Sequence, residues 1–176
     1  RDVLSNLPGS TIIADVKTSS VFYEEVKKLG GNPVMWKTGH SLIKSKMVEL
    51  NAPLAGEMSG HIFFADEYYG FDDAIYAALR LLRLLNRNDL RLDQLRDSLP
   101  IKFNTPELRF NCSDERKFSI VEKVRQRLQN SEHTNICDID GIRVETNEGW
   151  WLLRASNTQP VIVARCESDT ENGLLR

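Results

Sequence analysis

The sequence predicts a layered α/β domain followed by a small α+β domain with an antiparallel sheet. Over about the first hundred residues, strand and helix signals alternate, which is typical of layered α/β domains. After Pro100 a single helix is followed by strands alone, which is typical of an antiparallel sheet. The 176 residues are enough for one large domain or two small ones, and the change of pattern favours two.

Short β-branched or apolar runs predict the strands. In the first half they lie at residues 11–16, 33–37 and 62–65. The last of these is wholly apolar, and we expect it to be buried on both faces. In the second half they lie at residues 136–139, 142–146, 149–154 and 161–166. Asp140-Gly141 joins the first two of these as a hairpin. Residues 102–110 suit either a linker or an edge strand.

Capping residues and apolar periodicity predict the helices. In the first half, the residues that can cap a helix after each strand are Ser19 or Ser20, Ser41 and Asp72. One face of the second helix carries Leu42, Ile43, Met47 and Leu50. The third helix carries an apolar stripe formed by Ile75, Leu79, Leu82 and Leu85. A further helix is predicted to begin at Ser113 or Asp114. The side chains expected to face inward from it are Phe118, Val121, Val124 and Leu128.

Composition excludes several classes of function. With a net charge of −2, the chain lacks the basic excess of a nucleic-acid binder. No apolar run is long enough to span a membrane, and we find no signal peptide. Three widely spaced cysteines form no CxxC pair, which argues against a zinc site and favours the reducing cytoplasm. Because the sequence starts at Arg1 without a Met, we interpret it as a fragment, with a processed natural chain as the alternative.

Residues 154–160 join two apolar strands and gather groups that suit a phosphate. Arg154 supplies a forked cation, and Ser156, Asn157 and Thr158 supply hydroxyl and amide donors close by. Backbone N–H groups of the turn can add to them. The alternative is a self-contained polar turn, in which Ser156 and Asn157 bond their own backbone. Composition alone leaves both interpretations open.

Residues 56–61 lead into the third strand, and such a loop presents side chains at the edge of a sheet. Glu57 accepts hydrogen bonds, Ser59 donates and accepts them, and His61 can do either, a combination that suits sugar hydroxyls. The flanking glycines permit a ligand to approach the backbone closely. The alternative is a solvated Glu57 beside a hydrogen-bonded, half-buried His61.

Lys17 and residues 37–40 follow the other two strands of the same domain. Backbone amides at the helix start after Thr38 and Gly39 would favour an anion. Taken singly, each lysine is more often a solvated surface residue. Three polar motifs at strand ends in one domain nevertheless favour a binding site. None of the acidic pairs has the dense carboxylate spacing of a metal loop, so no metal site is predicted.

Together these motifs resemble those of the α-D-phosphohexomutase superfamily, and within it bacterial phosphomannomutase/phosphoglucomutase. The resemblance covers essentially the whole chain, and its motifs stand in family order at residues 15–17, 38–41, 56–61, 72–73 and 154–160. It implies the third and fourth of four domains. The third would be an α/β three-layer domain with a mixed sheet at residues 1–103. The fourth would be a small α+β domain with an antiparallel sheet at residues 104–176.

The resemblance implies a role for each candidate residue. The groups that would bind sugar hydroxyls are Glu57, Ser59, Thr38 and Gly39. The groups that would bind the phosphate that is not reacting are Arg154, Ser156, Asn157 and Thr158. The groups that would act at the reacting end, as acid, base or electrostatic residues, are His61, His40 and Lys17.

The resemblance also implies a reaction for the whole enzyme. A phosphoserine would donate its phosphoryl group to a hexose phosphate, and the other phosphate of the resulting 1,6-bisphosphate would return to the serine. Mg²⁺ would be the cofactor, and glucose 1,6-bisphosphate the activator and intermediate. Neither the family's Ser-His-Asn-Pro segment for the serine nor its Asp-Gly-Asp-Gly-Asp segment for Mg²⁺ occurs in this chain. We therefore expect the chain alone to be inactive.

The implied partners are mannose or glucose 1- and 6-phosphates and the N-terminal domains of the same enzyme. A phosphoglucosamine mutase is the closest alternative, but its phosphate loop tends to read Arg-Pro-Ser-Gly-Thr-Glu-Pro, unlike Ala155, Asn157 and Gln159 here. A non-catalytic sugar-phosphate binding module and a structural domain with polar loops are further alternatives. Because the motifs address hydroxyls other than O2, they do not distinguish mannose from glucose.

Overall fold

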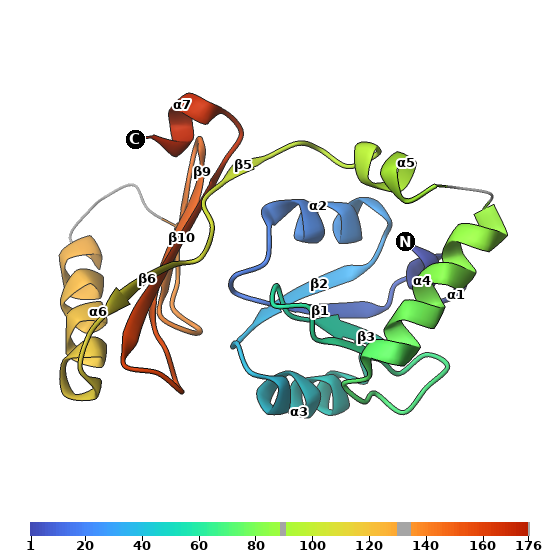
Figure 1. Ribbon diagram of the computed structural model, residues 1–176, viewed down its shortest axis with the longest axis horizontal. Coiled ribbons are helices and arrows are strands. Elements are labelled where there is room, and N and C mark those ends of the chain that lie inside the picture. The colour runs from blue at the N-terminus through green and yellow to red at the C-terminus, as the bar shows by residue number, and fades with distance from the viewer. Residues whose placement is uncertain (89–90, 130–134, 176) are drawn as a thin grey trace. The chain divides into compact units, whose positions relative to one another are not determined.

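The computed structural model divides the chain into two units, Arg1–Pro100 and Ile101–Arg176. It describes residues 1–88, 91–129 and 135–175. The first unit alternates strands and helices, whereas the second places a long helix before a series of consecutive strands (Figure 1). Both fold classes expected from the sequence are therefore confirmed.

The first unit is built on a four-stranded sheet in the order β2-β1-β3-β4 (Figure 1). The central strand β1 (Thr11–Asp15) runs parallel to β2 (Asn32–Trp36) and to β3 (Leu54–Gly56). The last strand, β4 (Ile62–Phe64), runs antiparallel to β3. The sheet is therefore mixed, and the parallel strands all end at the same edge.

Helices cover both faces of this sheet. α2 (Ser20–Lys28) and α3 (His40–Leu50) lie on opposite sides of it (Figure 1). Because side chains alternate along a strand, Ile12 of β1 packs in the cluster that contains α2, whereas Ile13 packs in the cluster that contains α3. The unit therefore has three layers. Its remaining helices are α1 (Asp2–Asn6), α4 (Ala74–Asn88) and α5 (Leu92–Asp97).

A buried arginine attaches α4 to the rest of the unit. Arg80 is 4% exposed and donates hydrogen bonds at 2.6 Å to both carboxylate oxygens of Asp66 and one at 3.2 Å to Asp2. Burial alone would raise the pKa of Asp66, but the hydrogen bonds and charge of Arg80 outweigh it and lower that pKa. The stabilisation from this ion pair is therefore present at neutral pH and is lost as the pH falls through the lowered pKa of Asp66.

The predicted third strand is buried on one face, at Phe63, and only partly on the other, where Phe64 packs against the cluster that contains Ile12. β4 is the last strand of the sheet, paired with β3 and joined to Asp72 by a single bridge at Phe63, and Ile62 is 38% exposed. An edge strand has one open side, so its apolar residues need not be covered twice. β3 was not predicted, because Pro53 and Gly56 leave room for only three paired residues.

Two of the predicted helix caps are wrong. α3 begins at His40 with Gly39 as its N-cap at φ 135°, so Ser41 lies inside the helix. Asp73, rather than Asp72, accepts a hydrogen bond from the backbone N–H of Tyr76 at the start of α4 (2.9 Å). The Asp72 carboxylate bonds to a histidine instead. Ser19 caps α2, as expected, by accepting from the N–H of Val21.

Several side chains expected to face a core are exposed. On α3, Ile43 and Met47 are buried but Leu42 and Leu50 are exposed, because a single i,i+4 pair faces the sheet. On α4, Arg80 faces inward in place of the expected stripe. Three residues of that stripe, Ile75, Leu79 and Leu82, are exposed, and Leu85 is half-buried. On the long helix of the second unit, Phe118 is 57% exposed.

The second unit contains a wholly antiparallel sheet around its longest strand, β10. The strand order is β5-β10-β9-β8-β7, and β6 also pairs with β10. Residues 102–110 thus supply two edge strands rather than a free linker. The strands are β5 (Phe103–Asn104), β6 (Leu108–Asn111), β7 (Asn135–Cys137), β8 (Ile142–Thr146), β9 (Gly149–Ala155) and β10 (Val161–Ser168).

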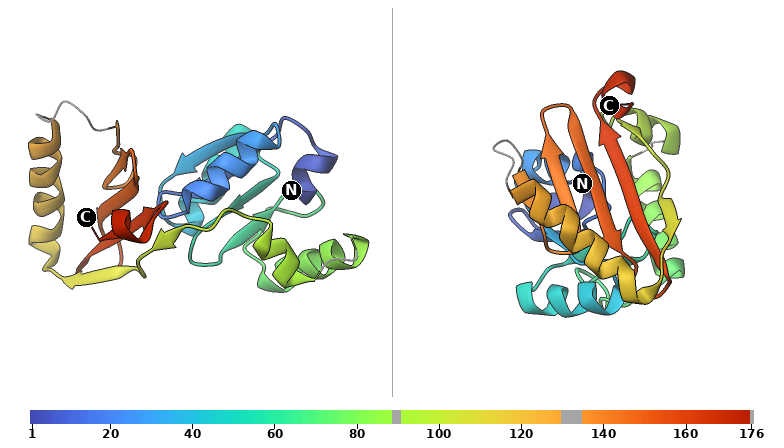
Figure 2. Two further views of the ribbon diagram at one scale, coloured as in Figure 1. Left: turned by 90° about the horizontal axis from the view of Figure 1, so that it is seen from above. Right: turned by 90° about the vertical axis from the view of Figure 1, so that its left-hand side faces the viewer.

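The helix α6 (Asp114–Gln129) packs along one face of this sheet (Figure 2). Val121 of α6 forms a buried cluster with Ile142 and Val144 of β8 and Ala155 of β9. The unit ends with a short helix, α7 (Glu171–Leu174). The core thus fixes the start of the loop between β9 and β10, where the predicted phosphate site begins.

Gly141 closes the turn before β8 with φ +85°, and a β-carbon there would lie 2.5 Å from the Cβ of Arg154. Replacement by Ala should therefore lower the free energy of unfolding by about 2–4 kcal/mol. Gly30 has a similar φ of +76° but no neighbouring atom within 4 Å, so Gly30→Ala should cost only about 1 kcal/mol. Urea unfolding measures both values, and equal losses would contradict the steric account.

Candidate functional site

A fully buried carboxylate, Asp15, organises the loops at the ends of the parallel strands. It accepts hydrogen bonds from the hydroxyls of Thr18 (2.7 Å) and Thr38 (3.4 Å) and from the backbone N–H of Met58 (3.2 Å). The ammonium of Lys17, which is 7% exposed, lies 4.0 Å from the same carboxylate. Because a buried charge must be satisfied, Asp15 draws together the segments that follow β1, β2 and β3.

Glu57 links two of these segments directly. Its carboxylate accepts hydrogen bonds from the backbone N–H of Gly39 (3.1 Å) and from the hydroxyl of Ser59 (3.2 Å). Two backbone hydrogen bonds of 2.9 Å close the loop. The N–H of Glu57 donates to the carbonyl of His61, and the N–H of Gly60 donates to the carbonyl of Glu57. The structure thus brings together Glu57, Ser59, Thr38 and Gly39, the four residues expected to bind sugar hydroxyls.

The two histidines of the predicted site are neighbours. The ring centroids of His40 and His61 lie 6.2 Å apart. Nδ1 of His61 lies 2.7 Å from the carboxylate of Asp72, and the His61 side chain is 46% exposed. A carboxylate at Nδ1 favours the tautomer in which Nδ1 carries the hydrogen and leaves Nε2 as the proton acceptor. Asp72 therefore holds His61 through Nδ1 and leaves Nε2 on the other side of the ring.

In the second unit, Arg154 is buried at the start of the β9–β10 loop. It is 5% exposed, and Asp140 accepts from its Nε at 3.1 Å and its Nη2 at 3.3 Å. The carboxylate thus holds one edge of the guanidinium and leaves Nη1 directed away from that contact. Asn157 and Thr158 lie exposed further along the same loop.

Ser156 gives the loop its shape. It is 7% exposed, and its hydroxyl oxygen accepts from the backbone N–H groups of Gln159 (3.2 Å) and Thr158 (3.4 Å). This is the self-bonded turn that the sequence offered as an alternative for Ser156. A serine oxygen accepts two hydrogen bonds and still donates one, so the turn and an anion contact are compatible.

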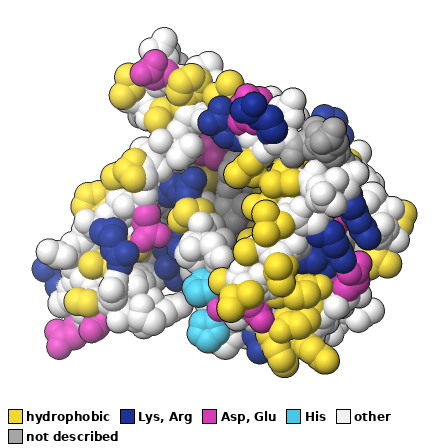
Figure 3. All heavy atoms as spheres, turned by 45° about the vertical axis from the view of Figure 1, so that its right-hand side comes forward, with side chains coloured by type: hydrophobic (Ala, Val, Ile, Leu, Met, Phe, Trp, Pro, Cys, Tyr) yellow, Lys and Arg dark blue, Asp and Glu magenta, His cyan; other side chains and the backbone are white. Residues whose placement is uncertain are grey.

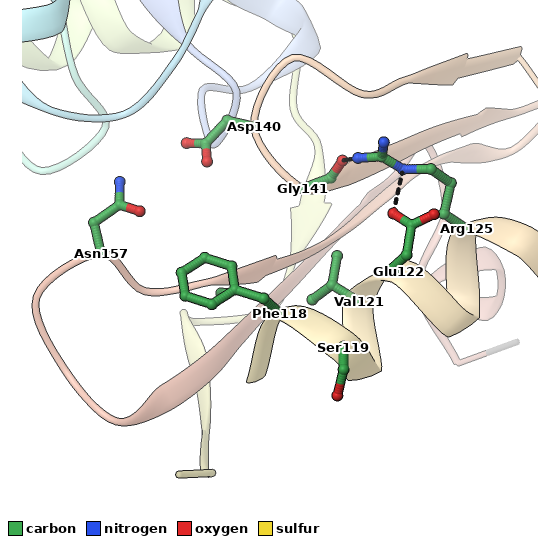
Figure 4. A pocket seen from close by; sticks show the side chains of 9 residues that line it. Phe118, Ser119, Val121, Glu122, Arg125, Asp140, Gly141 and Asn157 are labelled. Atoms are coloured by element: carbon green, nitrogen blue, oxygen red, sulfur yellow. Dashed lines mark hydrogen bonds and ion pairs between the residues drawn. The ribbon is translucent and has the colours of Figure 1, made fainter. Parts of the chain in front are cut away.

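A cavity of about 430 Å³ borders this loop within the second unit. Asn157, Asp140 and Phe118 line it from the loop, the turn and α6 (Figure 4). Arg125 of α6 donates to the carbonyl of Gly141 at 3.3 Å and so steadies the turn that carries Asp140 (Figure 4). The volume falls within the range of small-molecule sites.

Two family models match the chain, one over each unit. Residues 1–103 match phosphoglucomutase/phosphomannomutase, alpha/beta/alpha domain III. Residues 107–176 match the phosphoglucomutase/phosphomannomutase C-terminal domain. The chain belongs to the phosphoglucomutase/phosphomannomutase family.

Individual proteins of the family are similar over the whole chain. A phosphomannomutase/phosphoglucomutase of Pseudomonas aeruginosa is 47% identical over 176 residues, 100% of this chain and 38% of the relative. The crystal structure of a family protein of Burkholderia thailandensis superposes with a TM-score of 0.89 at 44% identity, over 99% of this chain and 37% of that one. An Aspergillus fumigatus N-acetylphosphoglucosamine mutase, solved with glucose 1,6-bisphosphate, shares the fold at 12% identity (TM-score 0.68; 98% and 38% covered).

The sequence analysis did not single out three carboxylates that hold predicted site residues. Asp15 was noted only as part of a motif, Asp72 as a helix start, and Asp140 as a turn residue. Each holds a predicted site residue: Lys17, His61 and Arg154. A carboxylate at the end of a buried strand, as at Asp15, needs donors nearby, and that signal was available in the sequence.

Neither a cluster of metal ligands nor a membrane-spanning helix is found in the part of the chain that the structure describes. Within residues 1–88, 91–129 and 135–175, no group of three or more His, Cys, Asp or Glu side chains could hold a metal. Over the same ranges, none of the helices has the length and apolar character that crossing a membrane requires.

Asp15→Asn should loosen all three loops at once. Because the amide cannot replace the charge and leaves donors unsatisfied, the free energy of unfolding should fall by about 2–4 kcal/mol. The matched change Thr18→Ala removes one hydrogen bond to Asp15 and should cost about 1 kcal/mol. Denaturant unfolding gives the totals, and amide hydrogen exchange at Met58 should accelerate only in Asp15→Asn. Unchanged exchange at Met58 would contradict the organising role.

Proposed function

We propose that the chain is the substrate-binding part of a phosphohexomutase that interconverts 1- and 6-phosphates of mannose or glucose. Membership of the family supports the class of reaction. The observation that carries the proposal is Arg154, held by Asp140 at the base of a loop with exposed Asn157 and Thr158. A clamped guanidinium beside neutral donors suits the phosphate that is not reacting.

At the phosphate end, Arg154 contributes the charge and the loop contributes donors. Asp140 occupies Nε and one N–H of Nη2, so the remaining N–H groups of the fork can donate to phosphate oxygens. The hydroxyl hydrogen of Ser156, the amide of Asn157 and the hydroxyl of Thr158 would complete the set. Because Asp140 fixes the guanidinium beforehand, little side-chain entropy is lost on binding.

At the sugar end, Glu57 is the principal acceptor. Its two oxygens offer about four lone-pair sites, of which Gly39 and Ser59 use two. Two sugar hydroxyls can therefore donate to the same carboxylate, while Ser59 and the Thr38–Gly39 segment line its sides. A pair of hydroxyls such as O3 and O4 is recognised in this way whichever end of the sugar carries the reacting phosphate.

His61, His40 and Lys17 are proposed to act at the reacting end. His61 would exchange a proton through Nε2, because Asp72 holds Nδ1. His40 adds a second imidazole at a ring distance of 6.2 Å. Lys17 would stabilise negative charge rather than transfer a proton, since its ammonium is already placed by Asp15 at 4.0 Å.

The remaining chemistry belongs to the whole enzyme. The chain spans 38% of the length of the Pseudomonas aeruginosa relative. We propose that the rest supplies a phosphoserine, which forms and consumes a hexose 1,6-bisphosphate such as glucose 1,6-bisphosphate, together with the Mg²⁺ site. The described residues do not fit Mg²⁺, since they contain no cluster of candidate ligands.

The chain alone should show no mutase activity, because its sequence has neither the Ser-His-Asn-Pro nor the Asp-Gly-Asp-Gly-Asp segment. A coupled assay that follows glucose 6-phosphate formation from glucose 1-phosphate, with glucose 1,6-bisphosphate and Mg²⁺ present, measures this. The full-length protein serves as the positive control. Turnover by the purified chain would contradict the proposal that the phosphoserine and the Mg²⁺ site lie outside it.

In the full-length protein, Arg154→Ala should lower kcat/KM about 10- to 150-fold in both directions, as expected for loss of a charged hydrogen bond. Arg154→Lys should recover only part of the loss, because an ammonium cannot form the fork. Thr158→Ala tests the exposed side of the loop without disturbing the core and should raise KM. Arg91→Ala, at an exposed arginine of the first unit, is the matched control. Unchanged kinetics in Arg154→Ala and in Thr158→Ala would reject the phosphate role.

A further inference from the structure

A buried lysine, Lys117, contacts the end of the β9–β10 loop. Lysine side chains normally keep their ammonium in water, and on the face drawn in Figure 3 the Lys and Arg side chains (dark blue) reach the surface. Lys117 lies near the start of α6 and is only 3% exposed. Because burial of an ammonium is unfavourable unless its charge is satisfied, the partners of Lys117 show what holds it there.

The ammonium of Lys117 bonds to one group of its own helix and to one group of the loop. Nζ lies 2.6 Å from the carboxylate of Asp114, three residues earlier on α6. It also donates a hydrogen bond to the backbone carbonyl of Gln159 at 3.1 Å. The Asp114 side chain is 72% exposed, so water solvates that carboxylate with or without the lysine. The contact that reaches beyond α6 is therefore the one with Gln159.

Gln159 is a point at which the loop is tied to the rest of the second unit. Its backbone N–H donates to the hydroxyl of Ser156 at 3.2 Å. Its backbone carbonyl accepts from the N–H of Val161 at 2.8 Å as well as from Lys117. Its side-chain carbonyl accepts from the guanidinium of Arg109 on β6. Gln159 is thus held by its own loop, by a neighbouring strand and by α6.

The exposed donors of the loop lie between two fixed residues. Ser156, which is 7% exposed, precedes them, and Gln159 follows them. Asn157 and Thr158, between these two, are exposed. A two-residue segment between fixed ends has few accessible conformations. The position of Gln159 therefore determines where the side chains of Asn157 and Thr158 stand, and Lys117 holds that position from α6.

We propose that Lys117 is a positioning residue for phosphate binding, which fixes the Gln159 end of the loop so that Asn157 and Thr158 can donate to the phosphate. The inference rests on the proposed function of this loop. Lys117 acts through Gln159 and not on the ligand, since its ammonium is buried and bonded to that carbonyl. For stability alone, an apolar side chain of similar length would serve as well, because it avoids the desolvation of an ammonium.

Steady-state kinetics of the full-length protein test the proposal. Lys117→Met keeps the length of the side chain and leaves Asp114 solvated, so the thermal midpoint should change little. KM for glucose 1-phosphate and for glucose 6-phosphate should rise about 3- to 10-fold, with kcat within about twofold, because the phosphate that is not reacting is bound in ground and transition states alike. Lys123→Met, at an exposed lysine of the same helix, is the matched control and should leave KM and kcat unchanged.

A double variant separates an action through the loop from a general weakening of the protein. Thr158→Ala is introduced into the native protein and into Lys117→Met. If Lys117 places Thr158, this change should raise KM by a smaller factor in Lys117→Met than in the native protein. Equal factors in the two proteins, or a native KM in Lys117→Met, would overturn the proposal. A lower kcat at native KM would also overturn it, since that result would place Lys117 at the reacting end.

Two further variants keep the outcome decisive. If Lys117→Met does not fold, Lys117→Gln takes its place, because its shorter side chain also withdraws the donor from the carbonyl of Gln159, and the same rise in KM is expected. Arg154→Ala in the same assay tests the phosphate role itself. A raised KM in Arg154→Ala with a native KM in the Lys117 variant would overturn only the role of Lys117. Native kinetics in Arg154→Ala and in Thr158→Ala would instead reject the proposed function.

Discussion

The arrangement of the first unit depends on one buried carboxylate. Asp15 stands at the end of the central strand with no exposed surface, and an isolated charge there would be strongly unfavourable. It is stabilised by two threonine hydroxyls, one backbone N–H and a lysine, which come from the segments after three different strands. The parallel strands end at one edge of the sheet. Asp15 holds together the three loops that begin there.

The second unit uses the same device in a different architecture. Asp140 holds the buried guanidinium of Arg154. The next residue, Gly141, has no side chain, so the turn can lie directly against Arg154 of β9. In both units a carboxylate determines where a cationic or polar group stands. Pre-positioned groups lose less entropy when a ligand binds.

Much of this fold could be predicted from the sequence, because the strongest signals are local. The strand ending at Asp15, the helix capped by Ser19 and the Asp140-Gly141 turn all follow from residue type and spacing. The prediction failed where tertiary context decides. β3 is too short for a periodic signal, and β4 looks buried because its edge position is not encoded in its own residues.

In the candidate site, too, local signals were predictable from the sequence and tertiary contacts were not. The polar residues of the loops could be chosen from the sequence, because donors and acceptors at strand ends are visible there. Their partners could not, since Asp72 lies next to Asp73, and only the fold shows that one meets His61 and the other starts α4. The stripe on α4 was correctly seen as apolar, but sequence periodicity does not show that Arg80, and not the stripe, faces the core.

If the first unit binds sugar hydroxyls and the second binds phosphate, their loops should respond to different ligands. Two-dimensional NMR of the ¹⁵N-labelled chain, titrated in parallel with inorganic phosphate and with mannose 1-phosphate, measures these responses. Phosphate should shift only amides of residues 155–159. Mannose 1-phosphate should shift these amides and, in addition, those of Gly39 and Met58. Shifts confined to residues outside both loops, with either ligand, would contradict the account.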